Sequence, residues 1–203
     1  NTDCKYRVMV PPKLKNTIGM PFVEILDDKN KQHKLKISSS EFLTLTAATS
    51  IKHRVRMTML YYHGEKKNLC VIGTTNKSEY LQGYFVKYGD GGSDIEPLIN
   101  IYKLQVYQLG KFLKVPKEIL NKDASPDVWS FATTDEEFFY SVPYEIVDLI
   151  LYARENNLSV KDIQKLSNLS TEDIENLLRI QNQKQIKSQH MREMPHGWMS
   201  DFT

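Results

Sequence analysis

Cysteines, long apolar runs and an excess of either charge are scarce in this sequence. Its two cysteines, Cys4 and Cys70, lie far apart, and Cys70 falls inside an apolar run. We therefore expect reduced, buried thiols in a cytoplasmic protein rather than a disulfide. No apolar run approaches the ~20 residues that a transmembrane helix needs, and the polar first residues do not resemble a signal peptide. We expect no membrane partner.

The charges almost cancel. Lys and Arg total 27 against 25 Asp and Glu, and the net charge of +2 argues against a surface that binds nucleic acid. At 203 residues, 40% of them hydrophobic, the chain is long enough to bury one ordinary core. We predict a single domain over residues 1–203, with N-terminal strands (1–46), a nucleotide-binding core (47–142) and a helical C-terminal part (143–203).

Apolar spacing alternates between strand and helix patterns along the first half of the chain. It predicts strands at 6–10, 21–26, 32–38 and 69–73 and helices at 47–62, 76–88 and 100–113. Ile51, Val55, Met59 and Tyr62 share one face of the helix at 47–62. The run 69–73 is typical of a buried parallel strand because it is apolar throughout.

The C-terminal third is predicted to be helical. Residues 120–142 read as a long ordered loop, and Pro143 can begin a helix. Ser159 and Ser170 each precede an Asp by three residues, as at helix starts. A DNA-reading helix-turn-helix at 159–180 is the alternative, but it shows no basic recognition face. The alternation of strand and helix predicts an α/β fold with a parallel sheet flanked by helices.

A group of polar residues follows the predicted strand at 69–73. Thr74 ends the strand, at the sheet edge where open α/β folds bind ligands, and Glu79 lies about one helical turn further on. A carboxylate beside phosphates is best explained by a shared Mg²⁺ ion. The alternative is that Thr74 caps the next helix and that Glu79 is a solvated acid in its first turn.

The next segment adds a cation and a glycine-rich acidic turn, Lys87 followed by Gly89-Asp90-Gly91-Gly92-Ser93-Asp94. Its glycines allow the backbone to approach a ligand closely. In this order and spacing, residues 49–195 resemble the ammonia-dependent NAD synthetase family of the ATP-pyrophosphatase superfamily. The resemblance implies the adenine-nucleotide alpha-hydrolase-like version of the α/β fold.

The resemblance assigns roles residue by residue. It implies ATP contacts for Thr74, Lys103 and Ser125, a Mg²⁺ ligand in Glu79, and contacts with the dinucleotide substrate for Arg54, Lys87, Asp94 and His190. Without it, Arg54 belongs to a basic helix surface and Lys103 is an ordinary lysine of a first helical turn.

The resemblance also implies a reaction. ATP adenylates the carboxylate of nicotinic acid adenine dinucleotide, and ammonia then displaces AMP to give NAD. Asp94 or Asp90 can accept the proton, and the loop at 120–142 can exclude water. The family's dinucleotide site lies at a dimer interface, so we expect a homodimer.

Several family features are missing. The Ser-Gly-Gly-x-Asp-Ser loop that binds pyrophosphate is absent, Met191 replaces an expected Lys, and Ser50 stands where Asn is usual. We expect this loop upstream of Asn1, in a synthetase of which the chain is an incomplete representation. The alternatives are a ligase that adenylates a different carboxylate and a degenerate nucleotide-binding protein without catalysis.

Overall fold

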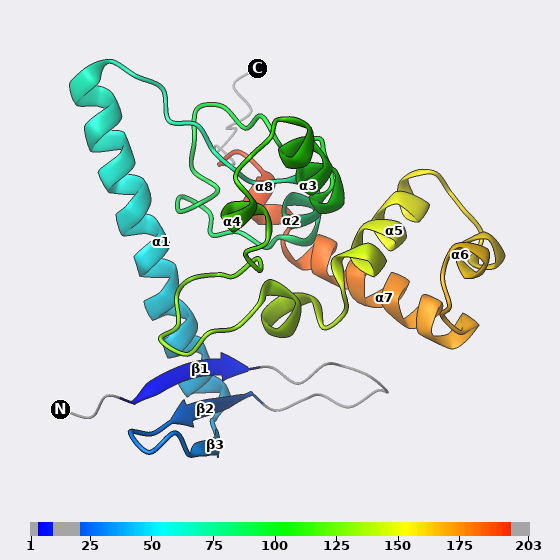
Figure 1. The fold of residues 1–203 in the computed structure, drawn as a ribbon, viewed down its shortest axis with the longest axis horizontal. Coiled ribbons are helices and arrows are strands. Elements are labelled where there is room, and N and C mark those ends of the chain that lie inside the picture. Colours follow the sequence, from blue (N-terminus) through cyan, green and yellow to red (C-terminus); the bar gives the residue numbers. More distant parts are fainter. Residues whose placement is uncertain (1–3, 10–20, 196–203) are drawn as a thin grey trace, which may run out of the picture.

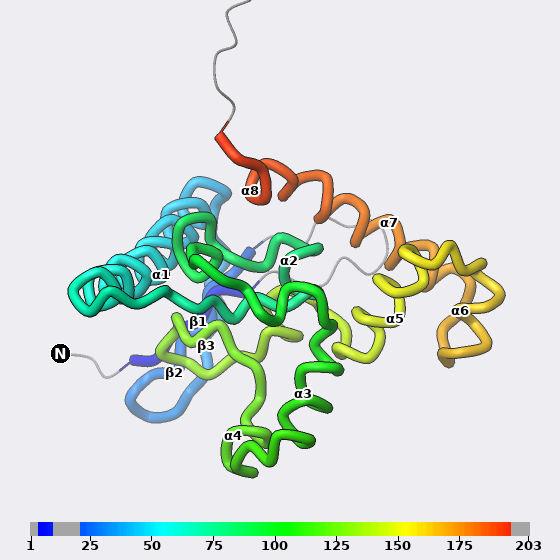
Figure 2. The backbone as a smooth tube through the Cα atoms, turned by 90° about the horizontal axis from the view of Figure 1, so that it is seen from above, coloured from blue at the N-terminus to red at the C-terminus, as the bar shows by residue number. Residues whose placement is uncertain are grey.

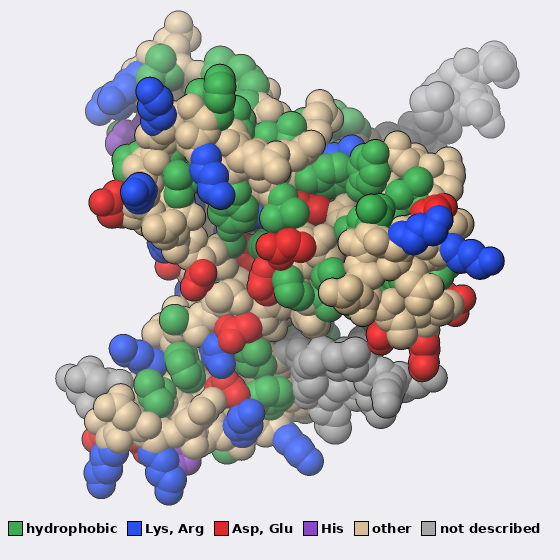
Figure 3. All heavy atoms as spheres, turned by 45° about the vertical axis from the view of Figure 1, so that its right-hand side comes forward, with side chains coloured by type: hydrophobic (Ala, Val, Ile, Leu, Met, Phe, Trp, Pro, Cys, Tyr) green, Lys and Arg blue, Asp and Glu red, His purple; other side chains and the backbone are tan. Residues whose placement is uncertain are grey.

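The computed structural model describes residues 4–9 and 21–195. In Figure 1 a small sheet lies at one end, a long helix and a body of loops and short helices follow, and a group of C-terminal helices lies on the side opposite the long helix. The view from above in Figure 2 shows the same separation. In Figure 3 a hollow separates the lower part, which carries the sheet, from the body above it. The α/β class with a helical C-terminal part is confirmed.

The sheet is an antiparallel meander. It comprises β1 (Lys5–Met9), β2 (Phe22–Leu26) and β3 (Gln32–Lys36) in that order, so the three predicted N-terminal strands are confirmed within about two residues. At its centre, Glu24 is only 3% exposed and pairs with Arg7 at 2.8 Å and with Lys34 at 3.0 Å. The amide of Phe131 donates to the Tyr6 carbonyl oxygen and joins β1 to the body.

The run 69–73 does not form the predicted buried parallel strand. The only parallel pairing among the described residues is an isolated bridge between Ile72 and Ile95, whereas the ladders of the sheet are antiparallel. Val71 faces inward, but Leu69 and Ile72 are more than half exposed. Cys70 is also exposed and Cys4 is partly buried, so the expectation of buried thiols is wrong for Cys70. With a single bridge beside it, only one face of the run is covered.

The long helix α1 (Ser39–Lys67) extends beyond the predicted 47–62 at both ends. Ser38 and Glu41 form a capping box at its start, and Asn68 ends it in the left-handed conformation. Within α1 only Gly64 is buried. The apolar face predicted from the sequence, which we call the α1 stripe (Ile51, Val55, Met59 and Tyr62), lies opposite Gly64 and is 51–59% exposed.

Short helices make up the body. They are α2 (Lys77–Gln82), α3 (Lys103–Phe112), α4 (Lys117–Leu120) and the π-helix η1 (Glu136–Tyr140). The predicted helix 76–88 is too long: α2 ends at Gln82 because Gly83 adopts φ +67° and caps it. The predicted loop 120–142 is irregular except for η1.

The C-terminal part follows the prediction closely. It contains α5 (Tyr144–Glu155), α6 (Val160–Leu166), α7 (Thr171–Lys187) and α8 (Gln189–Arg192). Ser159 and Ser170 cap α6 and α7 as their spacing predicts. One apolar cluster joins α5 to the body through Tyr102, Tyr140, Tyr144, Val147 and Leu151, and a second holds α5, α6 and α7 together through Ile150, Ala153, Ile163 and Ile174.

Candidate functional site

The segment from Thr74 to Glu79 turns from an extended run into α2. Asn76, rather than Thr74, caps this helix: its Oδ1 accepts the Glu79 amide at 3.1 Å, and Glu79 Oε2 accepts the Asn76 amide at 3.1 Å. Thr74 is exposed. The alternative that Glu79 is a solvated acid in the first turn of this helix is wrong, because its side chain is only 17% exposed. The cap holds the Glu79 carboxylate at a fixed place at the start of α2.

Glu79 pairs with Lys103, the first residue of α3. Lys103 Nζ lies 3.2 Å from Glu79 Oε1, and both side chains are mostly buried. Burial raises the pKa of Glu79, and the Lys103 ammonium only partly offsets this. Burial lowers the pKa of Lys103, but the charge and hydrogen bond of Glu79 together with the charge of Asp135 outweigh burial and raise it, so Lys103 stays cationic. Two residues assigned to one ligand site by resemblance are therefore brought into contact.

Asp135, which the sequence analysis did not single out, lies close to this pair. It is 5% exposed and accepts hydrogen bonds from the hydroxyls of Tyr84 at 2.7 Å and Tyr144 at 3.0 Å. Its amide donates to the carbonyl oxygen of Ala124, the residue before Ser125. Asp135 thus fixes the loop that carries Ser125 to the core. Its place in an acid-rich segment was the only signal in the sequence.

Ser125 is exposed and takes part in a local turn. Its Oγ accepts the amide of Asp127 at 3.2 Å. Two side chains of α1 hold the same loop, since Lys52 Nζ donates to the carbonyl oxygen of Val128 at 2.8 Å and Arg56 donates to that of Asp127 at 3.1 Å. The loop is therefore tied to α1 as well as to the core.

Three of the four residues matched to the dinucleotide meet at Lys87. Arg54 of α1 donates to the Lys87 carbonyl oxygen at 3.3 Å, and Lys87 Nζ donates to the carbonyl oxygens of His190 at 2.7 Å and Glu193 at 3.0 Å. Arg192 fastens α8 nearby by donating to the Tyr80 carbonyl oxygen at 3.0 Å. Helix α1 and the segment of α8 thus both bond Lys87, although they lie far apart in the sequence.

Asp94 forms its hydrogen bonds with residues outside this group. Its Oδ1 accepts the Tyr61 hydroxyl at 3.0 Å, and its Oδ2 accepts the Val71 amide at 2.7 Å. Both oxygens therefore hold the end of α1 to the run 69–73. Asp90, the other candidate proton acceptor, accepts the amide of Val86 and lies 3.3 Å from His53 Nδ1.

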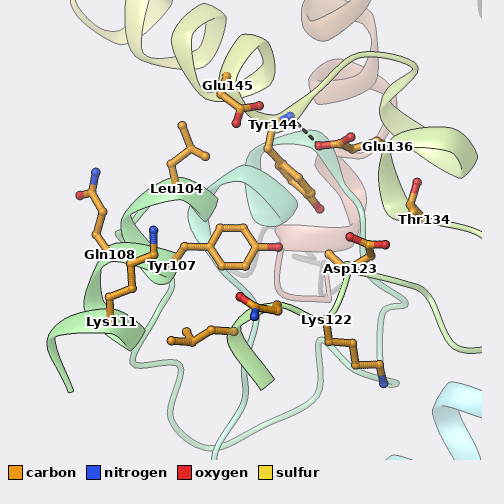
Figure 4. Close-up of a pocket in the computed structure, with 13 residues that line it drawn as sticks. Leu104, Tyr107, Gln108, Lys111, Lys122, Asp123, Thr134, Glu136, Tyr144 and Glu145 are labelled. Carbon is orange, nitrogen blue, oxygen red and sulfur yellow. Dashed lines mark hydrogen bonds between the residues drawn. The ribbon is translucent and has the colours of Figure 1, made fainter. Parts of the chain in front are cut away.

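A pocket of about 510 Å³, shown in Figure 4, opens next to the start of α3, where Leu104 lines it. The rings of Tyr107 and Tyr144 are turned towards the same space, and Glu136 accepts the Tyr144 amide at 2.9 Å. The Lys103 ammonium lies 5.9 Å from the centre of the Tyr107 ring and 5.3 Å from that of Tyr144. Leu104 and Ala124 line the pocket, so it borders the matched ATP residues without containing them.

A magnesium ion at Glu79 is implied by the resemblance. Over residues 4–9 and 21–195, no group of three or more His, Cys, Asp or Glu side chains is placed to hold a metal ion. Glu79 offers one hard carboxylate, and Mg²⁺ commonly binds one or two carboxylates together with phosphate and water oxygens. The donor set therefore fits an ion shared with phosphates and not an ion held by the protein alone.

Comparison with known proteins places this arrangement in a family. A family model described as NAD synthase matches residues 13–195. The NH(3)-dependent NAD(+) synthetase of Rhizobium rhizogenes is 41% identical over 71% of this chain and 43% of its own length. That of Mesorhizobium japonicum is 31% identical over 94% of this chain and 60% of its own length.

A solved structure agrees with these sequence matches. The structure of NMN synthetase from Francisella tularensis matches with a TM-score of 0.59 and 32% identity, over 80% of this chain and 63% of that one. The chain spans about half the length of the curated relatives it matches. The family match covers most of the sequence, and the chain belongs to the NAD synthase family.

Proposed function

We propose that this protein contributes to the ATP-dependent amidation of nicotinic acid adenine dinucleotide by ammonia, which yields NAD. The observation that carries this proposal is the meeting of Arg54, Lys87 and His190, which come from α1, the turn after α2 and α8. Arg54 and Lys87 bring two cationic side chains together, and these suit a ligand with two phosphates. The reaction itself is proposed from the relatives, which are named NH(3)-dependent NAD(+) synthetases.

The Glu79–Lys103 pair supports the ATP half of the reaction. Adenylation forms a bond between the substrate carboxylate and the α-phosphorus of ATP and breaks the bond to pyrophosphate; ammonia then attacks the acyl carbon and AMP leaves. Lys103 is held as a cation beside Glu79 and can neutralise phosphate charge. Glu79 would hold Mg²⁺, which neutralises phosphate charge when bound. Thr74 and Ser125, both exposed, are proposed to contact the nucleotide.

Asp94 is proposed as a residue that borders the dinucleotide and not as the base. Its two oxygens accept hydrogen bonds from the Tyr61 hydroxyl and the Val71 amide, which fixes the carboxylate in a structural role between α1 and the run 69–73. Ammonia attacks as the neutral molecule, and the proton it loses can pass to water. Since residues 1–203 contain no Ser-Gly-Gly-x-Asp-Ser loop, the activity is proposed for a protein that supplies a pyrophosphate-binding loop as well.

The α1 stripe supports a homodimer. Ile51, Val55, Met59 and Tyr62 form an exposed apolar row along a helix, and exposed apolar patches mark association surfaces. Arg54, on the same helix, reaches Lys87, so a second copy seated on the stripe would lie close to the proposed dinucleotide site.

No described helix is long and apolar enough to cross a membrane. A cytoplasmic location, and no nucleic-acid partner, remain part of the proposal.

Pyrophosphate release tests the substrate assignment. The full-length protein is incubated with ATP, Mg²⁺ and ammonium together with a panel of carboxylic acids, and pyrophosphate and amide product are measured. We expect both products with nicotinic acid adenine dinucleotide, and at least a tenfold loss for Lys87→Met but not for Lys161→Met on α6. No turnover with the dinucleotide, together with turnover of another acid, would contradict the proposal.

A second candidate is amidation of nicotinic acid mononucleotide. It is favoured by the likeness to the NMN synthetase of Francisella tularensis. The mononucleotide lacks the adenylyl half of the dinucleotide, so it belongs in the same panel as a competing substrate. Calorimetry that shows dinucleotide binding without turnover would instead favour a binding protein that has lost catalysis.

A further inference from the structure

Helix α3 takes two of its first hydrogen-bond acceptors from other helices. The free N–H groups at the start of a helix need partners, which usually come from a side chain just before it. Here the Tyr102 side chain gives no such cap. Instead the amide of Lys103 donates to Ser78 Oγ at 3.0 Å, and the amide of Leu104 donates to Asp148 Oδ2 at 2.9 Å.

Asp148 joins these contacts into one buried group. Its other oxygen, Oδ1, accepts the Ser78 hydroxyl at 2.5 Å. Asp148 is 5% exposed and Ser78 is fully buried. A charged acceptor at the positive end of a helix forms stronger hydrogen bonds than a neutral one. The Asp148 carboxylate on α5 therefore holds α2 and the start of α3 at the same time.

The two residues that Asp148 reaches are neighbours of the candidate nucleotide site. Ser78 precedes Glu79, and Leu104 follows Lys103, so the Asp148 carboxylate links the chain neighbours of the two residues that form the 3.2 Å ion pair. A second carboxylate of α5 repeats the contact two turns later. Glu155 accepts Lys77 Nζ at 2.6 Å and also accepts the Tyr102 hydroxyl.

We propose that Asp148 is a positioning residue for the nucleotide site, which caps α3 from α5 and thereby sets the place of Lys103 relative to Glu79. The proposal rests on the proposed function for the role of Lys103 towards ATP. A carboxylate suits this task because both partners, the Ser78 hydroxyl and the Leu104 amide, donate to it. An asparagine offers one acceptor oxygen to two donors.

ATP binding to the full-length protein tests the proposal by calorimetry. We expect Asp148→Asn to weaken ATP binding about tenfold. The matched control is Asp162→Asn, a half-exposed acid that bonds Ser159 at the start of α6, far from the site, and we expect it to change binding less than twofold. An unchanged ATP affinity in Asp148→Asn would overturn the proposal.

A double-variant cycle separates positioning from general structural damage. If Asp148 acts through Lys103, Asp148→Asn should change ATP binding less than twofold when Lys103 is already replaced by Met. A tenfold loss in both backgrounds would overturn the proposal, because the effect would not pass through Lys103. Where Asp148→Asn fails to fold, Ser78→Ala, with an expected threefold loss, and its matched control Ser159→Ala replace it in the same cycle.

Amide hydrogen exchange without nucleotide distinguishes this proposal from the proposed function. We expect the amides of Lys103 and Leu104 to exchange at least tenfold faster in Asp148→Asn than in the wild type, while the amides of α7 are unchanged. Unchanged protection of the Leu104 amide in Asp148→Asn would overturn the proposal that Asp148 caps α3, and would leave the proposed function standing. Failure of the wild type to bind ATP would overturn the proposed function, and the positioning role with it, even where the exchange result is as expected.

Discussion

Buried ionisable side chains determine much of the local order in this molecule. Asp135 accepts two tyrosine hydroxyls and ties down the loop of Ser125 through its amide. Burial first raises the pKa of both Tyr84 and Tyr144; Asp135 adds to it at Tyr84, and Tyr140 and then Asp135 add to it at Tyr144, so both remain protonated donors at neutral pH. The network is therefore a set of fixed donors around one acceptor.

Replacement of this acceptor should destabilise the protein. In Asp135→Asn an amide group faces the two hydroxyl donors, and one of them loses its partner. We expect the free energy of unfolding to fall by about 1–3 kcal/mol, the usual cost of an unsatisfied buried donor, as measured by urea denaturation. Asp127→Asn, at an exposed position of the same loop, is the control. A loss below 0.5 kcal/mol, roughly the size of a surface substitution, would contradict this account.

Glu24 should make stability depend on acid pH. Burial alone would raise its pKa, but hydrogen bonds from Lys34 and Arg7 outweigh burial and lower it. A lowered pKa in the folded state gives stability that is present above the unfolded value of about 4.3 and is lost as the pH falls through the folded value. The wild type should therefore exceed Glu24→Gln in free energy of unfolding at pH 7, and the gap should close below about pH 4.3.

Urea denaturation of both proteins from pH 7 to pH 3.5 measures this gap. Glu175→Gln, at an exposed position of α7, serves as the control and should follow the wild type over the whole range. A gap that stays constant, or that widens in acid, would mean that the Arg7–Glu24–Lys34 group does not contribute as described.

At the scale of elements, the close approach of Gly83 to Ser188 joins α2 to the end of α7 and to α8. A Cβ atom at Gly83 would lie 2.1 Å from the Ser188 Cβ, and the φ of +67° disfavours any other residue. We expect Gly83→Ala to cost about 1–2 kcal/mol through its backbone alone, with a further loss from the clash. The clash should move α8 away from Lys87.

Limited proteolysis near residues 188–195 measures this displacement. Cleavage should be faster in Gly83→Ala, and the additional replacement Ser188→Gly should restore part of the resistance because it removes the clash but not the backbone strain. Equal cleavage rates in the wild type and Gly83→Ala would show that α8 does not depend on this contact.

Elements were predicted well where local chemistry decides them. The helix starts at Ser159 and Ser170 and the three N-terminal strands follow from capping residues and alternation. The run 69–73 was predicted wrongly because a parallel strand is defined by its neighbours, and a single bridge at Ile72 is its only described pairing. The premature end of α2 was missed because Gly83 sits in a sequence that otherwise continues helically.

For the candidate site, the resemblance supplied residues but not their partners. It could not reveal that Lys103 pairs with Glu79, that both oxygens of Asp94 are occupied, or that Lys87 holds the backbone of α8. Asp135 and Asp148 were not predicted at all. Each makes at least one contact with a residue more than 40 positions away, Tyr84 for Asp135 and Leu104 for Asp148, which no local spacing encodes.

At the scale of the whole molecule, the α1 stripe is the feature that points beyond one chain. It faces away from Gly64, the buried side of α1, and it continues an apolar pattern that the fold leaves uncovered. We expect Val55→Asp to shift the protein from dimer to monomer in sedimentation velocity. Desolvating a charge inside an apolar interface is strongly unfavourable.

A matched control for this test is Leu166→Asp. Leu166 is 63% exposed on α6, at the side of the molecule opposite α1 (Figure 2). Its replacement by Asp should leave the oligomeric state unchanged. A wild type that sediments as a monomer at micromolar concentration, or a Val55→Asp variant that remains a dimer, would contradict the proposed role of the stripe.

The cap that Asp148 gives to α3 also has a consequence for the order of folding. Residues 103 and 104 emerge during synthesis before α5, so the amide of Leu104 in the first turn of α3 lacks its acceptor until residue 148 has been made and α5 has docked. A short helix with unsatisfied amides at its start is unstable by itself. Lys103 therefore reaches its final place only late in the maturation of the chain, after the C-terminal helices have begun to assemble.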